Sequence, residues 1–334
     1  MRLKKETSFV ISGYNKLRES LKIAIFRDDL NIYEEKSVHF VKAKTILNKH
    51  GINIYRGCSH GCIYCDSRSK CYQFTHEFED IEVKQNAPEL LEDALRKKRK
   101  RCMIGTGSMC DPYIPAEKEL CLTRRCLEVI DKYNFGAAVL TKSDLVLRDL
   151  DILSRINRKS KAVVQMTLTT ADDSLCKKIE PGVCPTSRRF EALCACRDEG
   201  IPTVVWFTPL LPFINDTKEN IDGIIDYCVR AKVHAIICFG IGLTLREGNR
   251  EYFYASLDRK FPANPARPGE MSLKECYIRT FGNSYMVSSP HNNELMTYLS
   301  NLCKKNKIML GIENVFKWME EFPEPAPLQL EFDF

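Results

Sequence analysis

The chain has 334 residues, 44% of them hydrophobic, which is enough to bury a substantial core in one main domain. No apolar run of about 18 residues is present and the first residues are too polar for a signal peptide, so we expect no membrane partner and a cytoplasmic location. The formal charge of +6 permits an anionic partner, but it lacks the charge density of a dedicated nucleic-acid-binding protein.

The first 40 residues are expected to form an N-terminal extension, an accessory helix or strand pair without readable chemistry. From residue 51 onward, short β-rich runs alternate with longer helical patterns. The predicted strands are "INIYR", "RCMIGTG", "GAAVLT", "AVVQMTLT", "PTVVWFTP" and "HAIICFG", and the predicted helices cover residues 88–100, 117–133, 187–199 and 218–232.

Six such units over residues 41–245 favour an α/β fold with a partial (β/α)6 barrel of the TIM type over a complete eight-stranded one. An open doubly wound sheet has the same local pattern and stays an alternative. In both architectures the site lies where the strands end at their carboxyl side. Residues 246–322, with helices near 291–305 and 312–321, are expected to form a C-terminal region on the substrate side, and residues 323–334 a flexible tail.

Three cysteines, Cys58, Cys62 and Cys65, stand close together after the first predicted strand. They are too close to staple distant parts of the fold, and the other cysteines, with no export signal, are expected to be mostly reduced and buried. The C-x3-C-x2-C spacing can turn three thiolates toward one point, which favours an iron–sulfur cluster with one iron left free. Zinc would have to recruit Cys71, His60 or His76 as a fourth ligand; unliganded thiols are the remaining alternative.

With Tyr64 directly before the last cysteine, this motif resembles that of the radical S-adenosylmethionine (SAM) superfamily. The resemblance implies a [4Fe-4S] cluster whose open iron binds the amino and carboxylate groups of SAM. It also implies reductive cleavage of SAM to methionine and a 5'-deoxyadenosyl radical, which abstracts a hydrogen from the substrate. A barrel suits this chemistry because it shields a radical from water.

Further motifs are similar to those of the spore photoproduct lyase branch, from about residue 41 to the end. They are "YRGCSHGCIYCDSRS", "TKSD", "IEPG" and "RRFEA", in matching order and at similar spacings. The resemblance implies that Tyr64 lies beside the SAM adenine and that Lys142 pairs with the SAM carboxylate. The alternative interpretation of Lys142 is a solvated loop lysine without a ligand.

The segment "GTGSMCDPY" follows the second strand, where the superfamily places a Gly-rich loop against the methionine moiety. Gly105 and Gly107 would allow close backbone approach and Ser108 would add a hydroxyl, unless this is an ordinary turn. Thr167 matches a small hydroxyl residue that faces SAM, and a packing threonine is its alternative.

Two departures from the lyase motif stand against copying its mechanism. The position of the lyase's hydrogen-donating cysteine is Ser108 here, with Cys110 two residues later. Cys110 would share a face with Ser108 on an extended segment and is our candidate catalytic residue, although an ordinary thiol explains it equally well. Asp66 replaces a tyrosine that follows the third cluster cysteine. We therefore expect a relative of the lyase rather than the lyase itself.

Basic and aromatic side chains after the sixth strand suit a DNA lesion held out of the duplex. The candidate substrate residues are Arg246, Arg250, Tyr252 and Tyr285, with an apolar helix face as the alternative explanation for Tyr252. The terminal "QLEFDF", Gln329 to Phe334, resembles peptides by which bacterial repair proteins dock on the sliding clamp, and a tail strand folding back on the barrel explains it as well. A reductase or a flavodoxin-type protein is the expected electron donor.

Three functions are therefore compared. The leading hypothesis is a lyase-like radical SAM enzyme that acts on DNA and repairs a pyrimidine lesion. The second keeps the radical chemistry but directs it at a peptide, an RNA or a small molecule. The third is a non-enzymatic iron–sulfur or zinc protein that senses redox state, and Lys142 and the Gly-rich strand end argue against it because a sensor needs neither.

Overall fold

The computed structural model describes residues 38–262 and 271–322. Most of the predicted N-terminal extension and the predicted clamp-binding peptide, Gln329 to Phe334, lie outside the described residues. The domain boundaries inferred from the sequence stay predictions.

An eight-stranded sheet forms the centre of the fold, in the order β13-β10-β9-β8-β7-β6-β3-β2. Its strands are β2 (Leu47–Asn48), β3 (Gly51–Ile52), β6 (Met103–Thr106), β7 (Gly136–Thr141), β8 (Ala162–Thr167), β9 (Thr203–Trp206), β10 (Ala235–Ile237) and β13 (Met309–Leu310). All neighbours from β3 to β13 are parallel, and β2 is antiparallel to β3. In the described ranges no pairing joins β2 to β13, so the sheet is an open, partial barrel. The predicted fold class is confirmed, with β13 added as a further parallel strand.

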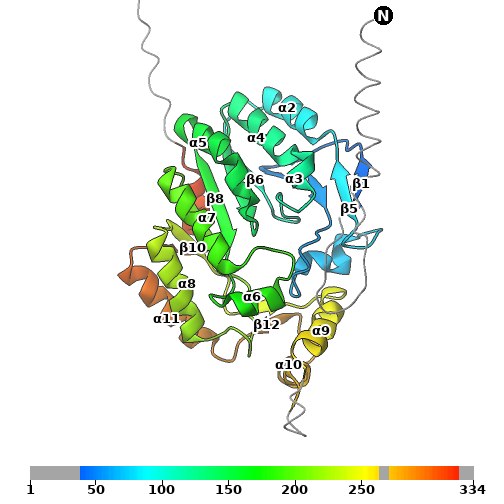
Figure 1. The fold of residues 1–334 in the computed structure, drawn as a ribbon, viewed down its shortest axis with the longest axis vertical. Coiled ribbons are helices and arrows are strands. Elements are labelled where there is room, and N and C mark those ends of the chain that lie inside the picture. Colours follow the sequence, from blue (N-terminus) through cyan, green and yellow to red (C-terminus); the bar gives the residue numbers. More distant parts are fainter. Residues whose placement is uncertain (1–37, 263–270, 323–334) are drawn as a thin grey trace, which may run out of the picture.

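Helices form the outer layer of this barrel (Figure 1): α2 (Ala87–Lys97), α4 (Leu122–Lys132), α5 (Leu150–Lys159), α7 (Thr186–Asp198), α8 (Lys218–Arg230) and α11 (Asn292–Lys305). The other helices are α3 (Glu117–Leu120), α6 (Asp173–Ile179), α9 (Asn249–Lys260), α10 (Leu273–Phe281) and α12 (Ile312–Glu320). Among the described residues, no helix combines the length and the apolar character needed to cross a lipid bilayer.

Side chains along the central strands alternate between two apolar cores, as the period of a β-strand requires. The core toward the outer helices contains Ile104, Val139, Val164, Val205 and Ile236. The core inside the barrel contains Met103, Ala138, Val163, Val204 and Ala235, together with Val315 and Met319 of α12. Helix α12 therefore fills the interior near the amino-terminal ends of the strands, and a cavity lies at their carboxyl ends.

The predicted first strand is divided between two sheets. Gly51–Ile52 belongs to the central sheet, whereas β4 (Tyr55–Arg56) joins β5 (Ile81–Lys84) and β1 (Val38–Val41) in a separate sheet of order β1-β5-β4. The side-chain pattern of "INIYR" runs through both pieces, and such a pattern does not say which strand each piece will pair with.

The helix predicted over residues 117–133 is broken at Cys121, whose φ of 51° is left-handed. The buried carboxylate of Glu117 accepts a hydrogen bond from the backbone N–H of Thr123 at 3.0 Å, and it also contacts the Arg148 guanidinium at 2.6 Å. Glu117 thus satisfies an open donor in the first turn of α4, which explains why the chain restarts its helix there.

Candidate active site

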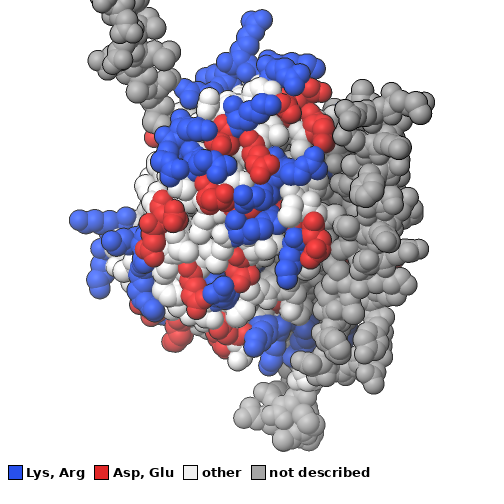
Figure 2. Space-filling view, turned by 45° about the horizontal axis from the view of Figure 1, so that its top comes forward, with Lys and Arg blue, Asp and Glu red and all other residues white. Residues whose placement is uncertain are grey.

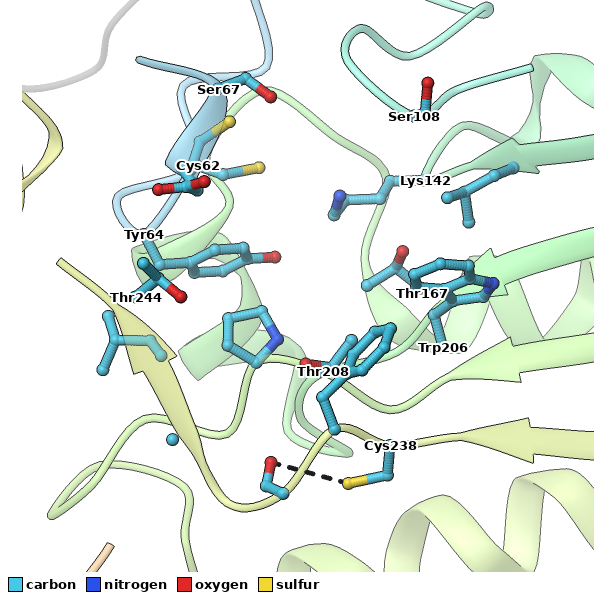
Figure 3. Close-up of a pocket in the computed structure, with 18 of the residues that line it drawn as sticks. Cys62, Tyr64, Ser67, Ser108, Lys142, Thr167, Trp206, Thr208, Cys238 and Thr244 are labelled. Atoms are coloured by element: carbon cyan, nitrogen blue, oxygen red, sulfur yellow. Dashed lines mark hydrogen bonds between the residues drawn. The ribbon is translucent and has the colours of Figure 1, made fainter. Parts of the chain in front are cut away.

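The carboxyl ends of the central strands open into a cavity of about 760 Å³ (Figure 3). Its walls come from the cysteine-bearing loop after β4, from the loops after β6, β7, β9 and β10, and from the antiparallel pair β11 (Gly242–Thr244) and β12 (Met286–Ser288). This is the edge of the sheet at which the sequence predicts the site.

The three motif cysteines, Cys58, Cys62 and Cys65, all line this cavity. The loop that carries them begins with a hydrogen bond from Cys58 N to Phe78 O at 2.9 Å. Burial raises the pKa of Cys65, and the neighbouring Cys58 sulfur raises it further. Burial also raises the pKa of Cys62, an effect that the Lys142 ammonium opposes. The sulfurs are therefore close enough to influence one another across a shared space.

The spacing of these three sulfurs fits a cluster better than a single ion. In the described part of the chain, they are not among the sets of ligand atoms that lie within 4.8 Å of one another. A single zinc ion with Zn–S bonds of about 2.3 Å would draw its sulfurs to about 3.8 Å apart. Three thiols that face one cavity at wider spacing suit a larger inorganic group, such as a cubane with one open iron.

The "IEPG" segment clamps the cysteine loop from the opposite side. Ile63 N donates to Ile179 O at 2.9 Å, and Gly182 N donates to His60 O at 2.8 Å. A Cβ on Gly182 would lie 2.6 Å from that same carbonyl, so this close approach requires glycine. The motif therefore fixes the backbone between the cluster cysteines.

A buried ion pair stands behind the clamp. Arg189 of the "RRFEA" segment contacts Glu180 at 2.6 Å, and both side chains are fully buried. Burial would raise the pKa of Glu180, but Arg189 and Lys142 outweigh it and hold the pKa below its usual value. Glu180 also accepts the phenol hydrogen bond of Tyr64, which lines the cavity. Arg189 further donates to the backbone carbonyl of Thr167 at 3.0 Å, so one pair connects two walls of the site.

Lys142 projects from the end of β7 into the cavity toward the cysteine-bearing loop (Figure 3). Burial acts to lower the pKa of Lys142, but Cys62 and then the carboxylates of Glu180 and Asp111 outweigh it, so the pKa is raised and the amine stays charged. The backbone at this position is fixed because Lys142 N donates to Asp111 Oδ2 at 2.7 Å. A charged ammonium aimed into a cavity can bind a carboxylate such as that of SAM.

The Gly-rich loop after β6 contributes Gly107 and Ser108 to the cavity lining. Gly107 has a φ of 86°, and a Cβ there would lie 2.1 Å from Leu140 O, so no other residue fits without displacing the backbone. Gly105 does not line the cavity: it lies within β6, where its N–H donates to His50 O at 2.7 Å.

Cys110 also lines the cavity, beside a cluster cysteine. Its sulfur lies 2.6 Å from Gly57 O, and its hydrogen bond to Cys58 is the largest cause of the lowered pKa of Cys58. Burial raises the pKa of Cys110 well above its ordinary value, so its hydrogen stays on the sulfur. Its role as a hydrogen donor stays a prediction.

An apolar wall faces the cluster side of the cavity. Trp206 and Phe239 form this wall, and Thr167 lies beside Trp206 (Figure 3). Trp206 and Phe239 have ring centroids 5.7 Å apart, and Trp206 is fixed by a hydrogen bond to Gln165 at 2.8 Å. Phe239 is 58% exposed, so this wall reaches the solvent at the mouth.

The four candidate substrate residues do not line the cavity among the described residues. Arg246 pairs with Asp66 at 2.6 Å, and Arg250 donates to the backbone carbonyls of Leu245, Asn283 and Ser284. The ring of Tyr252 lies 3.7 Å beneath the guanidinium of Arg68, whereas Tyr285 is 55% exposed. Their contact with a substrate stays a prediction.

Asp111 and Trp206 line the cavity without having been singled out from the sequence, and His60, which also lines it, was named there only as an alternative zinc ligand. His60 Nδ1 lies 3.6 Å from Asp111 Oδ2, and both side chains are buried. Burial would lower the pKa of His60, but Cys58 and Asp111 raise it overall. His60 and Asp111 lie inside the quoted motifs, and this position was the signal that could have identified them. Trp206 gave no such signal, because an apolar residue at the end of a strand usually belongs to the core.

The fold and this donor set define a class: α/β-barrel enzymes that hold a metal–sulfur cluster with an open position and bind an anionic group beside it. Residues 52–251 match the model of the radical SAM superfamily. This match covers more than half of the chain, so the chain belongs to the radical SAM superfamily. Its cofactors are therefore a [4Fe-4S] cluster and SAM, as predicted from the motif.

Two relatives in sequence are uncharacterized proteins. One, from Mycobacterium tuberculosis, is 28% identical over 261 residues, which are 72% of this chain and 75% of that protein. The other, from Methanocaldococcus jannaschii, is 34% identical over 187 residues, which are 53% of this chain and 69% of that protein.

Solved structures of spore photoproduct lyase share the fold. A mutant of that lyase superimposes with a TM-score of 0.58 at 13% identity and covers 82% of this chain and 81% of its own. The lyase in complex with dinucleoside spore photoproduct gives a TM-score of 0.57, also at 13% identity and with the same coverage. The expected similarity to the lyase fold is confirmed, and at this identity it concerns the fold alone.

Proposed function

We propose that this radical SAM enzyme acts on DNA and abstracts a hydrogen from a damaged pyrimidine. The observation that carries this proposal is the apolar wall formed by Trp206 and Phe239, which faces the cluster side and reaches the solvent. Aromatic side chains accept unstacked bases on their faces, and each such stack contributes about 1–3 kcal/mol. A flat base can lie against this wall while the rest of the strand stays outside.

The residues of the cofactor side have separate roles. When bound, the reduced cluster and SAM supply a 5'-deoxyadenosyl radical. Cys58, Cys62 and Cys65 hold the cluster, the Lys142 ammonium binds the SAM carboxylate, and Tyr64 lies beside the adenine. The apolar interior below the cavity excludes water from the reacting groups.

The solved complex of spore photoproduct lyase supports the choice of substrate class, since its ligand is a dinucleoside spore photoproduct. The charge distribution on the outer surface gives less support to a DNA substrate. On the face seen in Figure 2, lysine and arginine alternate with aspartate and glutamate without forming a continuous basic band. We therefore assign recognition of the lesion to the cavity rather than to that face.

Two macromolecular partners complete the proposal. A reductase or a flavodoxin-type protein delivers the electron. The peptide Gln329 to Phe334, outside the described residues, docks on the sliding clamp. Deletion of residues 328–334 should abolish clamp pull-down and leave SAM cleavage intact; unchanged pull-down would contradict the docking.

The decisive test is anaerobic reconstitution with iron and sulfide, followed by dithionite and SAM. We expect 5'-deoxyadenosine, and its absence from cluster-loaded protein would refute the radical chemistry. Ultraviolet-irradiated DNA with deuterated thymine should then transfer deuterium into deoxyadenosine. Transfer to no DNA, with SAM still cleaved, would direct the search to peptides, RNA or small molecules.

A variant of Cys110 tests whether this residue donates the hydrogen atom. Cys110→Ala should leave SAM cleavage intact and change the distribution of DNA products, because the cavity then lacks a thiol that can give a hydrogen to the substrate radical. Cys196→Ala, which removes a buried thiol outside the cavity lining, is the matched control. Identical product distributions in both variants would exclude Cys110.

A further inference from the structure

Two complementary side chains face each other on the outer surface of the three-stranded sheet. Strands β1 and β5 lie side by side (Figure 1) and pair in parallel. Their register sets His39 directly opposite Glu82. Ile81 and Val83, on either side of Glu82, are buried in the large core, so the alternation of the strand directs Glu82 to the outer face. In the same way, Val38 and Phe40 pack toward the core and leave His39 on the outer face.

A second histidine reaches this face from the loop before β5. The rings of His76 and His39 have centroids 4.9 Å apart. His76 Nδ1 lies 2.9 Å from Glu77 O, and because a carbonyl only accepts, the neutral ring carries its proton on Nδ1 and its lone pair on Nε2. His76 Nε2 is buried and has no hydrogen-bond partner among the described residues. Such an unsatisfied buried acceptor is rare and indicates a missing partner.

His39 is oriented in the same manner. Its Nδ1 lies 3.0 Å from Asp80 Oδ1, and the carboxylate fixes the proton on Nδ1 and the lone pair on Nε2. Histidines that bind metals usually donate their other N–H to a carboxylate or a backbone carbonyl. Both histidines of this face therefore have the second contact that a metal ligand needs.

We propose that His39, His76 and Glu82 form a zinc site separate from the cluster. One ligand atom of each lies within 4.8 Å of the others, and in the described ranges no other trio of such residues meets this spacing. The ligand atoms of one zinc ion lie about 3.3 Å apart, so side-chain rotations that move these atoms by about an ångström complete the site. Two imidazoles and a carboxylate are a preferred zinc donor set, and the partly exposed His39 leaves room for a water as the fourth ligand.

Two cations beside Glu82 in the sheet donate to other groups. The Lys84 ammonium, two residues along β5, donates to Asn53 O at 2.9 Å. Arg56 is the neighbour of Glu82 on the other side of the sheet. Its guanidinium donates instead to the backbone carbonyls of Tyr72 and Gln73, at 3.0 and 2.9 Å. The Glu82 carboxylate therefore stays available to an ion on the His39 side.

The zinc site would stabilise the segment that supports the cluster. The carbonyls of Phe78 and Asp80 press on Gly57, where a Cβ would lie 2.6 and 3.0 Å from them. Cys58 N, one residue later, donates to Phe78 O. A zinc ion that joins β1, β5 and the loop bearing His76 holds this segment against the start of the cysteine loop.

The test uses the full chain with its cluster reconstituted anaerobically, so that zinc cannot occupy the cluster cysteines. After dialysis against zinc, we expect about one zinc per chain by elemental analysis, and X-ray absorption with nitrogen and oxygen neighbours at about 2.0–2.1 Å. His76→Ala and Glu82→Gln should each weaken zinc binding at least about tenfold. His291→Ala, which removes an exposed histidine elsewhere, should change nothing.

Two outcomes overturn the proposal. One is sulfur scattering at about 2.3 Å, which would place the zinc on cysteines. The other is zinc binding by Glu82→Gln equal to that of the unmodified chain. Glu82→Gln keeps the shape of the side chain, so it decides the question even where His76→Ala fails to fold, and circular dichroism and iron content verify that each variant is intact.

Discussion

Replacing Arg189 with methionine removes one half of the ion pair behind the cysteine loop. Glu180 then keeps its buried position without its counter-charge. Breaking a fully buried pair in this way costs about 3–5 kcal/mol, because the remaining charge is left uncompensated. At about 2–4 °C per kcal/mol for domains of 150–250 residues, the melting temperature should fall by about 10 °C.

The neighbouring arginine provides a matched control. Arg188 is on the same helix and pairs with Asp144 at 2.9 Å, but both partners are substantially exposed. Surface pairs contribute little, so Arg188→Met should melt close to the unmodified chain. Thermal unfolding followed by circular dichroism compares the two variants, and iron content shows whether the cysteine loop still retains the cluster.

The effect of Arg189→Met also depends on pH. The pKa of Glu180 in the folded chain is below its usual value. The pair therefore contributes its full stability above the unfolded-state pKa of about 4.3, and this contribution is lost as the pH falls through the folded-state value. The difference between the two arginine variants should be largest near neutral pH and shrink in acid. Equal melting temperatures near neutral pH would refute the assignment of Arg189 as the support of the cysteine loop.

Three further predictions concern the cavity. Gly107→Ala should lower SAM affinity and thermal stability, because the new Cβ would clash with Leu140 O. Gly200→Ala is the control: Gly200 has a φ of 70° but open space around it, so this variant should lose only the backbone cost of about 1–3 kcal/mol. Equal SAM affinity and equal melting temperature in the two glycine variants would refute the role of close packing at Gly107. Lys142→Met should weaken SAM binding about 10- to 150-fold in equilibrium dialysis, the loss of a hydrogen bond to a charged group, with iron content unchanged; unaltered affinity would exclude the carboxylate contact. Phe239→Ala should weaken binding of lesion-containing DNA about 5- to 150-fold in fluorescence anisotropy while DNA-independent SAM cleavage persists; equal DNA affinity would remove the stacking wall from the proposal.

Local spacing made the cofactor side predictable. Cys58, Cys62 and Cys65 lie within eight residues, so the chain itself keeps them together, and Lys142 could be placed because the end of a parallel strand has a known location in such folds. The six βα units were readable for the same reason, since strand and helix periods are local properties.

Features that depend on pairing between distant segments were not predictable. The alternation of β1 and β5 is visible only once their register sets His39 opposite Glu82. The helix break at Cys121 depends on Glu117, whose side chain turns back onto α4 and also contacts Tyr55, far away in sequence. Gly105 was grouped with Gly107 because both belong to one motif, yet only Gly107 faces the cavity.

Helix α12 has a consequence for the order in which ligands bind. Ile312, at its first turn, lines the cavity, while Val315 and Met319 fill the interior beneath. Among the described residues the cluster cysteines and Lys142 line the same cavity as the exposed Phe239, so the cofactor and the substrate share this space. We expect SAM to enter first and leave last, so saturating substrate should trap SAM and slow its exchange. In steady-state kinetics, this arrangement gives compulsory-order rather than random addition.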